Sequence, residues 1–308
     1  IQHVYNSKFS GDMGFGRGWR LNYSQRLIWG YMNNDDYFRY VDADGTEHYL
    51  FRDPENTAEY IDEDGYGLRM TVNDADMVYR FTVTDKSNNS MVFDYYGLLQ
   101  KIEDANGNQN TFTYNSSDNL TQITDGAGRN FTLSYANGHL SSITDPAGRS
   151  VTFEYSVEDG IYRLIKINDP DGYSVNYGYN SQNLINSVKN IDNYELNFAY
   201  TEGTDKKVTT IDEVGTGGIS IDYSYAHNAT EVQDSTGNSL TYQFDNYGRV
   251  TSVKDAEGYA QYSAYFSEGS KNNKINSASR LQRTVQNLLL NGSFEGSNSA
   301  VTMVGGAA

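Results

Sequence analysis

The stretch LTQITDGAGRNFTLSY (Leu120–Tyr135) is followed at once by LSSITDPAGRSVTFEY (Leu140–Tyr155), which repeats its pattern 20 residues later. Each copy opens with a leucine, passes through an isoleucine and an aspartate to a turn ending in glycine, and closes with alternating apolar residues that end in tyrosine. An alternation with a period of two places one face of a strand against a core and the other toward water. The two copies therefore predict β-hairpins, and further copies would make the fold an array.

The same rhythm continues through about eight units, over residues 93–265. The acidic residue before the turn recurs every 20 to 24 residues, and the aromatic residue that closes each unit keeps a similar spacing. Aspartate at the first turn position can accept a backbone N–H and glycine at the fourth tolerates positive φ, so each turn is predicted to be type I with a bulge. The residues of this repeat signature are Asp104, Gly107, Tyr114, Asp125, Gly128, Tyr135, Asp145, Gly148, Tyr155, Asp169, Gly172, Tyr179, Asp234, Gly237, Asp255 and Gly258.

The composition supports an all-β fold. The chain has 27 Tyr and 29 Gly but only 3 Pro among its 308 residues, which is typical of strands joined by tight turns. One hairpin cannot bury enough apolar surface to offset the entropy lost when it orders, so neighbouring hairpins must pair edge to edge. We therefore predict a repeat array of antiparallel hairpins of ~21 residues that forms a long, twisted and curved sheet.

The beginning of the chain differs from the repeats. The segment GFGRGWRLNYSQRL (14–27) places Trp19 and Tyr23 among glycines that include Gly16 and Gly18. We predict that this segment is a cap that buries the first open strand edge. The predicted domains are a cap region over residues 1–39, divergent hairpins over 40–92, regular repeats over 93–265, a polar linker over 266–286 and the truncated start of another module over 287–308.

Charge and composition exclude several classes of partner. A formal net charge of -17 and a sequence pI of about 4.5 repel phosphate backbones, so we expect no nucleic-acid partner. The apolar runs are far shorter than the ~20 residues of a membrane span. Disulfides and thiolate metal sites are excluded because the chain has no cysteine. The acidic, Lys-poor surface favours a secreted or cell-surface protein, and the missing initiator Met and signal segment favour a fragment of a longer chain.

These residues resemble the YD-repeat, or Rhs, family, whose unit combines an Asp/Asn-x-x-Gly turn with an alternating strand that ends in tyrosine. TFTYNSSDNLTQITDGAG, TLSYANGHLSSITDPAG and TYQFDNYGRVTSVKDAEG match this unit in register. GRGWRLNYSQRL and DADGTEHYLF are similar to motifs that often precede the repeats in the family. Together the matching motifs cover nearly all of residues 11–265.

The resemblance implies a β-shell. In the family the strip of hairpins spirals into a hollow shell, which in bacterial polymorphic toxins encloses a C-terminal toxin; related strips occur in insecticidal toxin complexes and teneurins. Cell-surface members have been linked to carbohydrate binding, and NLLLNGSFEG (287–296) is similar to the opening strand of a jelly-roll carbohydrate-binding module. DPAG at Asp145 and DPDG at Asp169 lack the context of the family's self-cleavage segment, so no protease role is transferred.

Acidic turns are the only candidate metal sites. Oxygen-rich loops with glycine are used by Ca²⁺ sites, and DADG (42–45) and DEDG (62–65) each hold several carboxylates. The candidate ligands are therefore Asp42, Asp44, Asp62 and Asp64. The alternative, which we favour, is that these aspartates only cap their turns, and we expect no cofactor.

No pattern in the sequence indicates catalysis. Carboxylate pairs could serve a glycosidase, but no pair departs from the repeat as a catalytic pair should. His3, His48, His139 and His227 lack metal-ligand spacing and are predicted to be surface residues. The tyrosine rows should stack across neighbouring strands. They would form either a core whose tyrosines stay partly exposed to solvent or a platform on which sugars stack.

The sequence therefore predicts a non-enzymatic structural segment of a large secreted or cell-surface bacterial protein. Its principal partner would be the remainder of its own longer chain, including a possible C-terminal toxin that the shell encloses or presents. The alternative is a carbohydrate-binding or cell-surface-binding module that uses the tyrosine-rich strip, with glycans as partners. A glycosidase is the third possibility.

Overall fold

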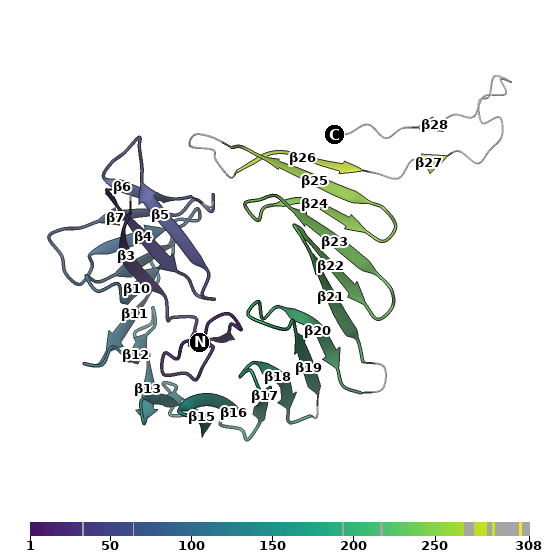
Figure 1. Ribbon diagram of the computed structural model, residues 1–308. Helices are drawn as coiled ribbons and strands as arrows, with labels where there is room; N and C mark the ends of the chain where they lie inside the picture. The colour runs from purple at the N-terminus through teal and green to yellow at the C-terminus, as the bar shows by residue number, and fades with distance from the viewer. Residues whose placement is uncertain are drawn as a thin grey trace. The chain divides into compact units, whose positions relative to one another are not determined.

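The computed structural model describes residues 1–32, 34–63, 65–192, 194–215, 218–267 and 274–281, and the backbone of 285–286 and 302–303. These residues form β-strands, turns and no helix, which confirms the predicted all-β fold (Figure 1). The chain divides into two compact units, Ile1–Lys207 and Val208–Ala308. Each unit contains one long sheet whose strands pair antiparallel in chain order.

In the first unit, strands β3 to β9 form a sheet that curls on itself. The start of β3 meets the β9–β10 connection, where Arg26 and Leu98 form a single bridge and Leu27 N–H donates to the Gly97 carbonyl oxygen at 3.1 Å. Gly97 has a φ of +76°, and a Cβ there would overlap the Leu27 carbonyl oxygen, so this approach requires glycine. Large side chains fill the curl, including Phe38, Leu50, Met70, Val83 and Phe93. The strands are β3 (Arg26–Met32), β4 (Asp35–Val41), β5 (Glu47–Arg52), β6 (Glu59–Asp62), β7 (Arg69–Val72), β8 (Phe81–Thr84) and β9 (Ser90–Phe93).

The same sheet continues as the regular hairpins of the first unit. These strands are β10 (Leu99–Glu103), β11 (Gln109–Tyr114), β12 (Leu120–Thr124), β13 (Asn130–Ala136), β14 (His139–Thr144), β15 (Ser150–Glu158), β16 (Ile161–Asn168), β17 (Ser174–Tyr179), β18 (Ile185–Asn190) and β19 (Glu195–Tyr200). The hairpin rhythm predicted from the sequence is present, and each Asp-x-x-Gly turn joins two of these strands.

A β-bulge recurs in these hairpins, and the sequence spacing explains it. Leu120 and Ile123 are three residues apart, although side chains on one face of a flat strand are two apart. Both are nevertheless buried, because the register shifts between Thr113 and Tyr114 on the partner strand, and Tyr114 pairs with Leu120. An extra residue in one strand bends the pair and increases its twist. The leucine at the head of each repeat therefore enters the core by way of a bulge.

The N-terminal segment, residues 1–25, lies on the inner side of the curved sheet of the first unit (Figure 1). It contains the two-stranded sheet of β1 (His3–Tyr5) and β2 (Trp19–Leu21). The sequence predicted that this segment covers the first strand edge, and the structure corrects this. Strand β3 is instead bridged to the 97–98 connection. Phe15, Trp19 and Leu21 belong to the core that lies against the repeats. Sequence alone gave no means to locate this contact, because its two sides lie more than 100 residues apart.

The second unit repeats the hairpin pattern in a sheet of seven strands. They are β20 (Val208–Glu213), β21 (Ser220–Ala226), β22 (Ala229–Asp234), β23 (Ser239–Phe244), β24 (Val250–Asp255), β25 (Ala260–Tyr265) and β26 (Ile275–Leu281). A separate pair follows, β27 (Val285–Gln286) with β28 (Thr302–Met303). Most of the predicted linker and of the predicted further module lies outside the described residues, and the predicted domain boundaries stay predictions.

Candidate functional site

The aspartate turns have one geometry throughout the array. In the six Asp-x-x-Gly turns of the repeat signature, the glycine N–H donates to the aspartate carbonyl oxygen at 2.8–3.3 Å, and the glycine φ lies between +76° and +90°. The aspartate carboxylate accepts the N–H of the residue after the glycine at 2.7–2.9 Å in each turn. Hydrogen bonds from Asn238 and Thr236 lower the pKa of Asp234 to about 2. These carboxylates therefore act as acceptors for the backbone of their own turn.

The tyrosine that closes each repeat hydrogen-bonds to the backbone of an earlier strand. The hydroxyls of Tyr114, Tyr135, Tyr179, Tyr200 and Tyr265 each donate to the carbonyl oxygen of the residue fifteen positions earlier, at 2.6–2.9 Å. Backbone pairing between β12 and β13 covers only Gln122–Thr124, so the Leu120 carbonyl is left for the Tyr135 hydroxyl. A buried carbonyl without a partner is costly, and the tyrosine supplies that partner. Tyrosine rather than phenylalanine is thus explained by its hydroxyl, a role that the alternating pattern did not reveal.

Tyr155 is the exception, and it lies where the N-terminal segment crosses the sheet. Its hydroxyl is buried and has no hydrogen-bond partner among the described residues. The N-terminal segment contacts the repeats here: the Gly14 carbonyl oxygen accepts Leu140 N–H at 2.8 Å. A Cβ on Gly16 would lie 3.0 Å from Leu164 N and 3.3 Å from the Tyr155 ring. The glycines of this segment therefore let its backbone approach the repeats closely.

Trp19 anchors the N-terminal segment to the tyrosine row. Its indole N–H donates to the Tyr179 hydroxyl at 2.9 Å, and that hydroxyl donates to the Leu164 carbonyl oxygen at 2.6 Å. The indole also packs edge-on against Tyr177, with ring centroids 4.9 Å apart. Tyr23 packs against Phe112 nearby, with centroids 5.0 Å apart. The motif residues of the segment thus contact the inner face of the repeats.

The histidine prediction was wrong for His48, which is buried, whereas His227 is exposed as expected. His3 and His139 are half-buried, with both ring nitrogens of His3 and most of the His139 side chain shielded from solvent. Aromatic neighbours explain the burial: His3 packs against Trp19 at 4.7 Å, and His139 stacks on Tyr162 at 3.6 Å. Burial lowers the pKa of His3 to about 3. His139 also pairs with Asp12 of the N-terminal segment, with Nε2 and Oδ2 2.9 Å apart.

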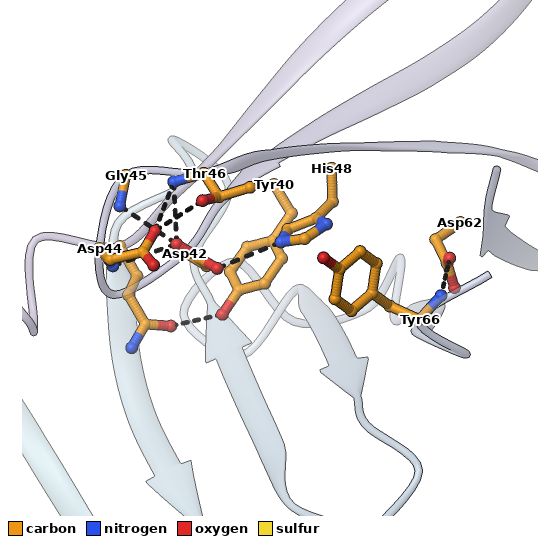
Figure 2. Close-up of polar contacts among 9 residues, drawn as sticks. Tyr40, Asp42, Asp44, Gly45, Thr46, His48, Asp62 and Tyr66 are labelled. Carbon is orange, nitrogen blue, oxygen red and sulfur yellow. Dashed lines mark hydrogen bonds and ion pairs between the residues drawn. The ribbon is translucent and has the colours of Figure 1, made fainter. Parts of the chain in front are cut away.

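The acidic turn at residues 42–46 is drawn in Figure 2. Asp42 Oδ1 accepts three backbone N–H groups at 3.0–3.1 Å, and its Oδ2 lies 3.1 Å from His48 Nε2. Partial burial opposes ionisation of Asp42, but hydrogen bonds from His48 and Asp44 outweigh it and lower the pKa to about 2. Asp44 accepts the N–H and hydroxyl of Thr46. The carboxylates of this turn are thus engaged by its own backbone and by His48.

The second acidic turn is built alike. Asp62 accepts backbone N–H groups from Tyr66 and Leu68, whereas Asp64 lies outside the described residues. Within the part of the chain that the structure describes, no three His, Cys, Asp or Glu side chains are grouped so as to hold a metal ion. The calcium hypothesis remains a prediction. In the same part of the chain, no helix is long and apolar enough to cross a membrane.

Three protein-family models match parts of this chain. The Teneurin YD-shell model matches residues 56–184, the RHS Repeat model matches 223–260, and a domain of unknown function, DUF6531, matches 1–50. The chain belongs to the YD/Rhs-repeat family. Its fold is that of a YD-shell segment, and the shell match covers strands β6 to β17, from the curl to the repeats under the N-terminal segment.

Individual relatives match only parts of the chain. The tRNA nuclease WapA of Bacillus subtilis (strain 168) is 29% identical over 122 residues, and the tRNA3(Ser)-specific nuclease WapA of Bacillus spizizenii is 28% identical over 122 residues. Each match covers 39% of this chain and 5% of the relative. Among solved structures, the chain is similar to the crystal structure of TcdB2–TccC3–TEV, with 9% identity and a TM-score of 0.35; the match covers 80% of this chain and 17% of that one. It is also similar to the Photorhabdus luminescens Tc holotoxin pore, with 12% identity and a TM-score of 0.35; that match covers 84% of this chain and 17% of the other.

Proposed function

We propose that this chain is a non-enzymatic wall segment of a large secreted or cell-surface bacterial YD/Rhs-repeat protein, and that the complete wall encloses or presents a C-terminal effector. One observation carries the proposal: in most repeats, the recurring polar groups bind the backbone of the sheet. Turn aspartates hold their turns and closing tyrosines hold strand carbonyls. Repeated polar groups that hydrogen-bond to the protein's own backbone stabilise the sheet, which fits a structural role.

The N-terminal segment supports the same role. It covers the apolar inner face of the repeats with Phe15, Trp19 and Leu21, and its Asp12 pairs with His139 of β14. A wall whose inner face is apolar needs either a cover or contents, because a large apolar surface is not left in water by a stable monomer. The segment provides that cover over the described hairpins of the first unit.

Enclosure can be tested on the longer natural chain that contains this segment. Limited proteolysis should leave the residues downstream of 308 uncut while the wall is intact, because an enclosing sheet blocks the protease. A Trp19→Ala variant, which loosens the inner cover, should make the same downstream residues cleavable at lower protease concentration. Equal cleavage in both proteins, at sites spread through the downstream part, would argue against enclosure.

The absence of catalysis is a separate part of the proposal. The relatives whose names include tRNA nuclease share only 5% of their length with this chain, so that activity need not belong to this region. Incubation of the 308-residue chain with total bacterial tRNA should leave the tRNA intact on a denaturing gel. Cleavage that co-purifies with the chain and disappears in a carboxylate variant would contradict the proposal.

Glycan recognition along the tyrosine rows is the second candidate. It is favoured by two exposed rings of the second unit that lie outside the rows, namely Tyr247 of the 245–248 turn (81% exposed) and Tyr262 of β25 (47% exposed). It has less support in the first unit, where the row hydroxyls are engaged by backbone carbonyls. A glycan array probed with the 308-residue chain and with Tyr247→Ala would show whether these rings take part.

A further inference from the structure

A cavity of about 780 Å³ opens at one end of the curl formed by β3 to β9. In an antiparallel sheet, alternate connections come to the same end, and curling the sheet arranges them in a ring. Residues of the β3–β4, β5–β6, β7–β8 and β9–β10 hairpins line the cavity accordingly. Its size lies within the range of about 300–1,000 Å³ that is usual for small-molecule sites.

Aromatic side chains form the floor and one wall of the cavity. Phe38 packs edge-on against Tyr60, with ring centroids 5.0 Å apart, and at a tilt against Phe81, with centroids 5.1 Å apart. Trp29 extends from β3 with 62% of its surface exposed, and Tyr95 is 51% exposed. An indole this exposed contributes little to the core, yet it lines the cavity beside buried rings.

Two arginines and two aspartates line the same cavity. Trp29 Nε1 donates to Asp36 Oδ1 at 3.0 Å, and Arg52 Nη2 donates to the Tyr60 hydroxyl at 2.8 Å. Arg80 pairs with Asp74, while its Nε is buried and has no hydrogen-bond partner among the described residues. Arg52 lies 3.3 Å from Asp35, outside the lining, and 3.8 Å from Asp36, so each arginine lies beside a carboxylate. The four charged residues that line the cavity carry no net formal charge.

We propose that this cavity binds a neutral, polyhydroxylated ligand, namely a saccharide of one or two rings. The flat apolar face of a sugar ring would lie against Trp29, and neighbouring hydroxyls would bond to the paired guanidinium and carboxylate groups of Arg52 with Asp36 and of Arg80 with Asp74. A hydroxyl both donates and accepts, so it matches such pairs. The proposal is independent of the wall function, and its failure would leave that function untouched.

Charged ligands fit this cavity less well. A quaternary ammonium needs open aromatic faces, but the guanidinium of Arg52 lies 4.9 Å from the Tyr60 ring centre and that of Arg80 lies 5.7 Å from those of Phe81 and Tyr95. An anion would meet Asp36 and Asp74 beside the arginines. The net charge of -17 on the whole chain adds to the repulsion of anions.

The test is a titration of the 308-residue chain with glucose, galactose, N-acetylglucosamine, maltose and cellobiose, followed by saturation-transfer NMR and by acrylamide quenching of tryptophan emission. The chain has two tryptophans, and Trp19 is buried, so protection from quenching reports Trp29. At least one of these sugars should bind with a Kd of about 10 mM or tighter and protect Trp29. Choline and glucuronate, added at the same concentrations, should protect it less.

Two variants complete the test. Trp29→Ala should weaken the binding of the best sugar by at least about 10-fold, which corresponds to about 1.4 kcal/mol. Tyr173→Ala, which removes an aromatic ring that is 56% exposed outside the cavity, should change it by less than about 2-fold. The proposal is overturned if no sugar of the panel binds, if binding survives Trp29→Ala, or if choline or glucuronate binds more tightly than every neutral sugar.

Discussion

Two sets of hairpins in this protein share one repeat but differ in burial. In the covered repeats, residues 120–185, the leucines and isoleucines at the inward positions are buried apart from the half-buried Ile167, and Leu140 and Leu164 are fully buried. In the uncovered repeats, residues 220–265, the residues at the same motif positions, such as Val250 and Val253, are only half-buried. The N-terminal segment lies on the first set, and no described residue of the second unit covers the second set.

This difference separates two roles of the sequence. The repeat itself fixes strands, turns and bulges, because these depend on residues within one or two hairpins. The core depends in addition on what lies against the inner face, which the repeat does not encode. A covered repeat is therefore stabilised by tertiary packing. An uncovered repeat depends on the backbone hydrogen bonds between its strands, on its turns and on its tyrosine hydrogen bonds.

The largest effect is expected at Trp19. Trp19→Ala should lower the free energy of unfolding of the first unit by about 3–5 kcal/mol, because a large buried ring and its bond to Tyr179 are lost. Trp29→Ala is the matched control, since that ring is 62% exposed, and should cost less than about 1 kcal/mol. Urea unfolding followed by circular dichroism measures both. Equal costs would show that the cover adds nothing.

The two sets of repeats can be compared directly with one substitution in each. Leu140→Ala should cost about 2–5 kcal/mol, because Leu140 is fully buried beneath the N-terminal segment. Val250→Ala, at the equivalent motif position, should cost less than about 1 kcal/mol, since Val250 is only half-buried. Hydrogen exchange of the two regions assigns each loss to its unit. A cost at Val250 as large as that at Leu140 would contradict the distinction.

Acid should loosen the cover before it affects the uncovered repeats. Burial lowers the pKa of His3 from 6.5 to about 3, so the unfolded state binds the proton more readily. The stability that the neutral ring provides is present above pH 6.5 and is lost as the pH falls toward 3, at up to about 1.4 kcal/mol per pH unit. Thermal unfolding between pH 7 and pH 4 should show this slope for the wild type. His3→Leu should flatten it, and an unchanged slope would exclude His3 as its origin.

The smallest effect concerns the tyrosine row. Tyr135→Phe removes the donor to the Leu120 carbonyl and should cost about 0.5–1.5 kcal/mol. Tyr155→Phe is an internal control, because the Tyr155 hydroxyl is buried without a described partner, and it should be neutral or slightly stabilising. Chemical denaturation resolves the pair. The opposite ranking would show that the hydroxyl bonds do not hold the strands.

Most of the fold could be predicted from the sequence because its determinants are local. Alternating residues such as Phe131, Leu133 and Tyr135 define a strand, and the Asp125–Gly128 turn joins it to the preceding one. The bulge could have been predicted as well, since the three-residue spacing of Leu120 and Ile123 conflicts with a flat strand.

The contacts of residues 1–25 could not be predicted in the same way. Trp19 meets Tyr179 across 160 positions of sequence, and no pattern in a single chain pairs them. His3 and His48 gave no signal of burial, because their aromatic neighbours come from other strands. The cavity beneath Trp29 was missed for the same reason, since it forms only when four hairpin connections come together.

The most direct test of the account is hydrogen exchange on a variant that lacks residues 1–25, compared with the full 308-residue chain. If the N-terminal segment provides the core of the covered repeats, amide protection should fall in residues 120–185 and stay unchanged in residues 220–265. Loss of protection in both sets, or in neither, would contradict the claim that the same repeat is stabilised differently according to what covers it.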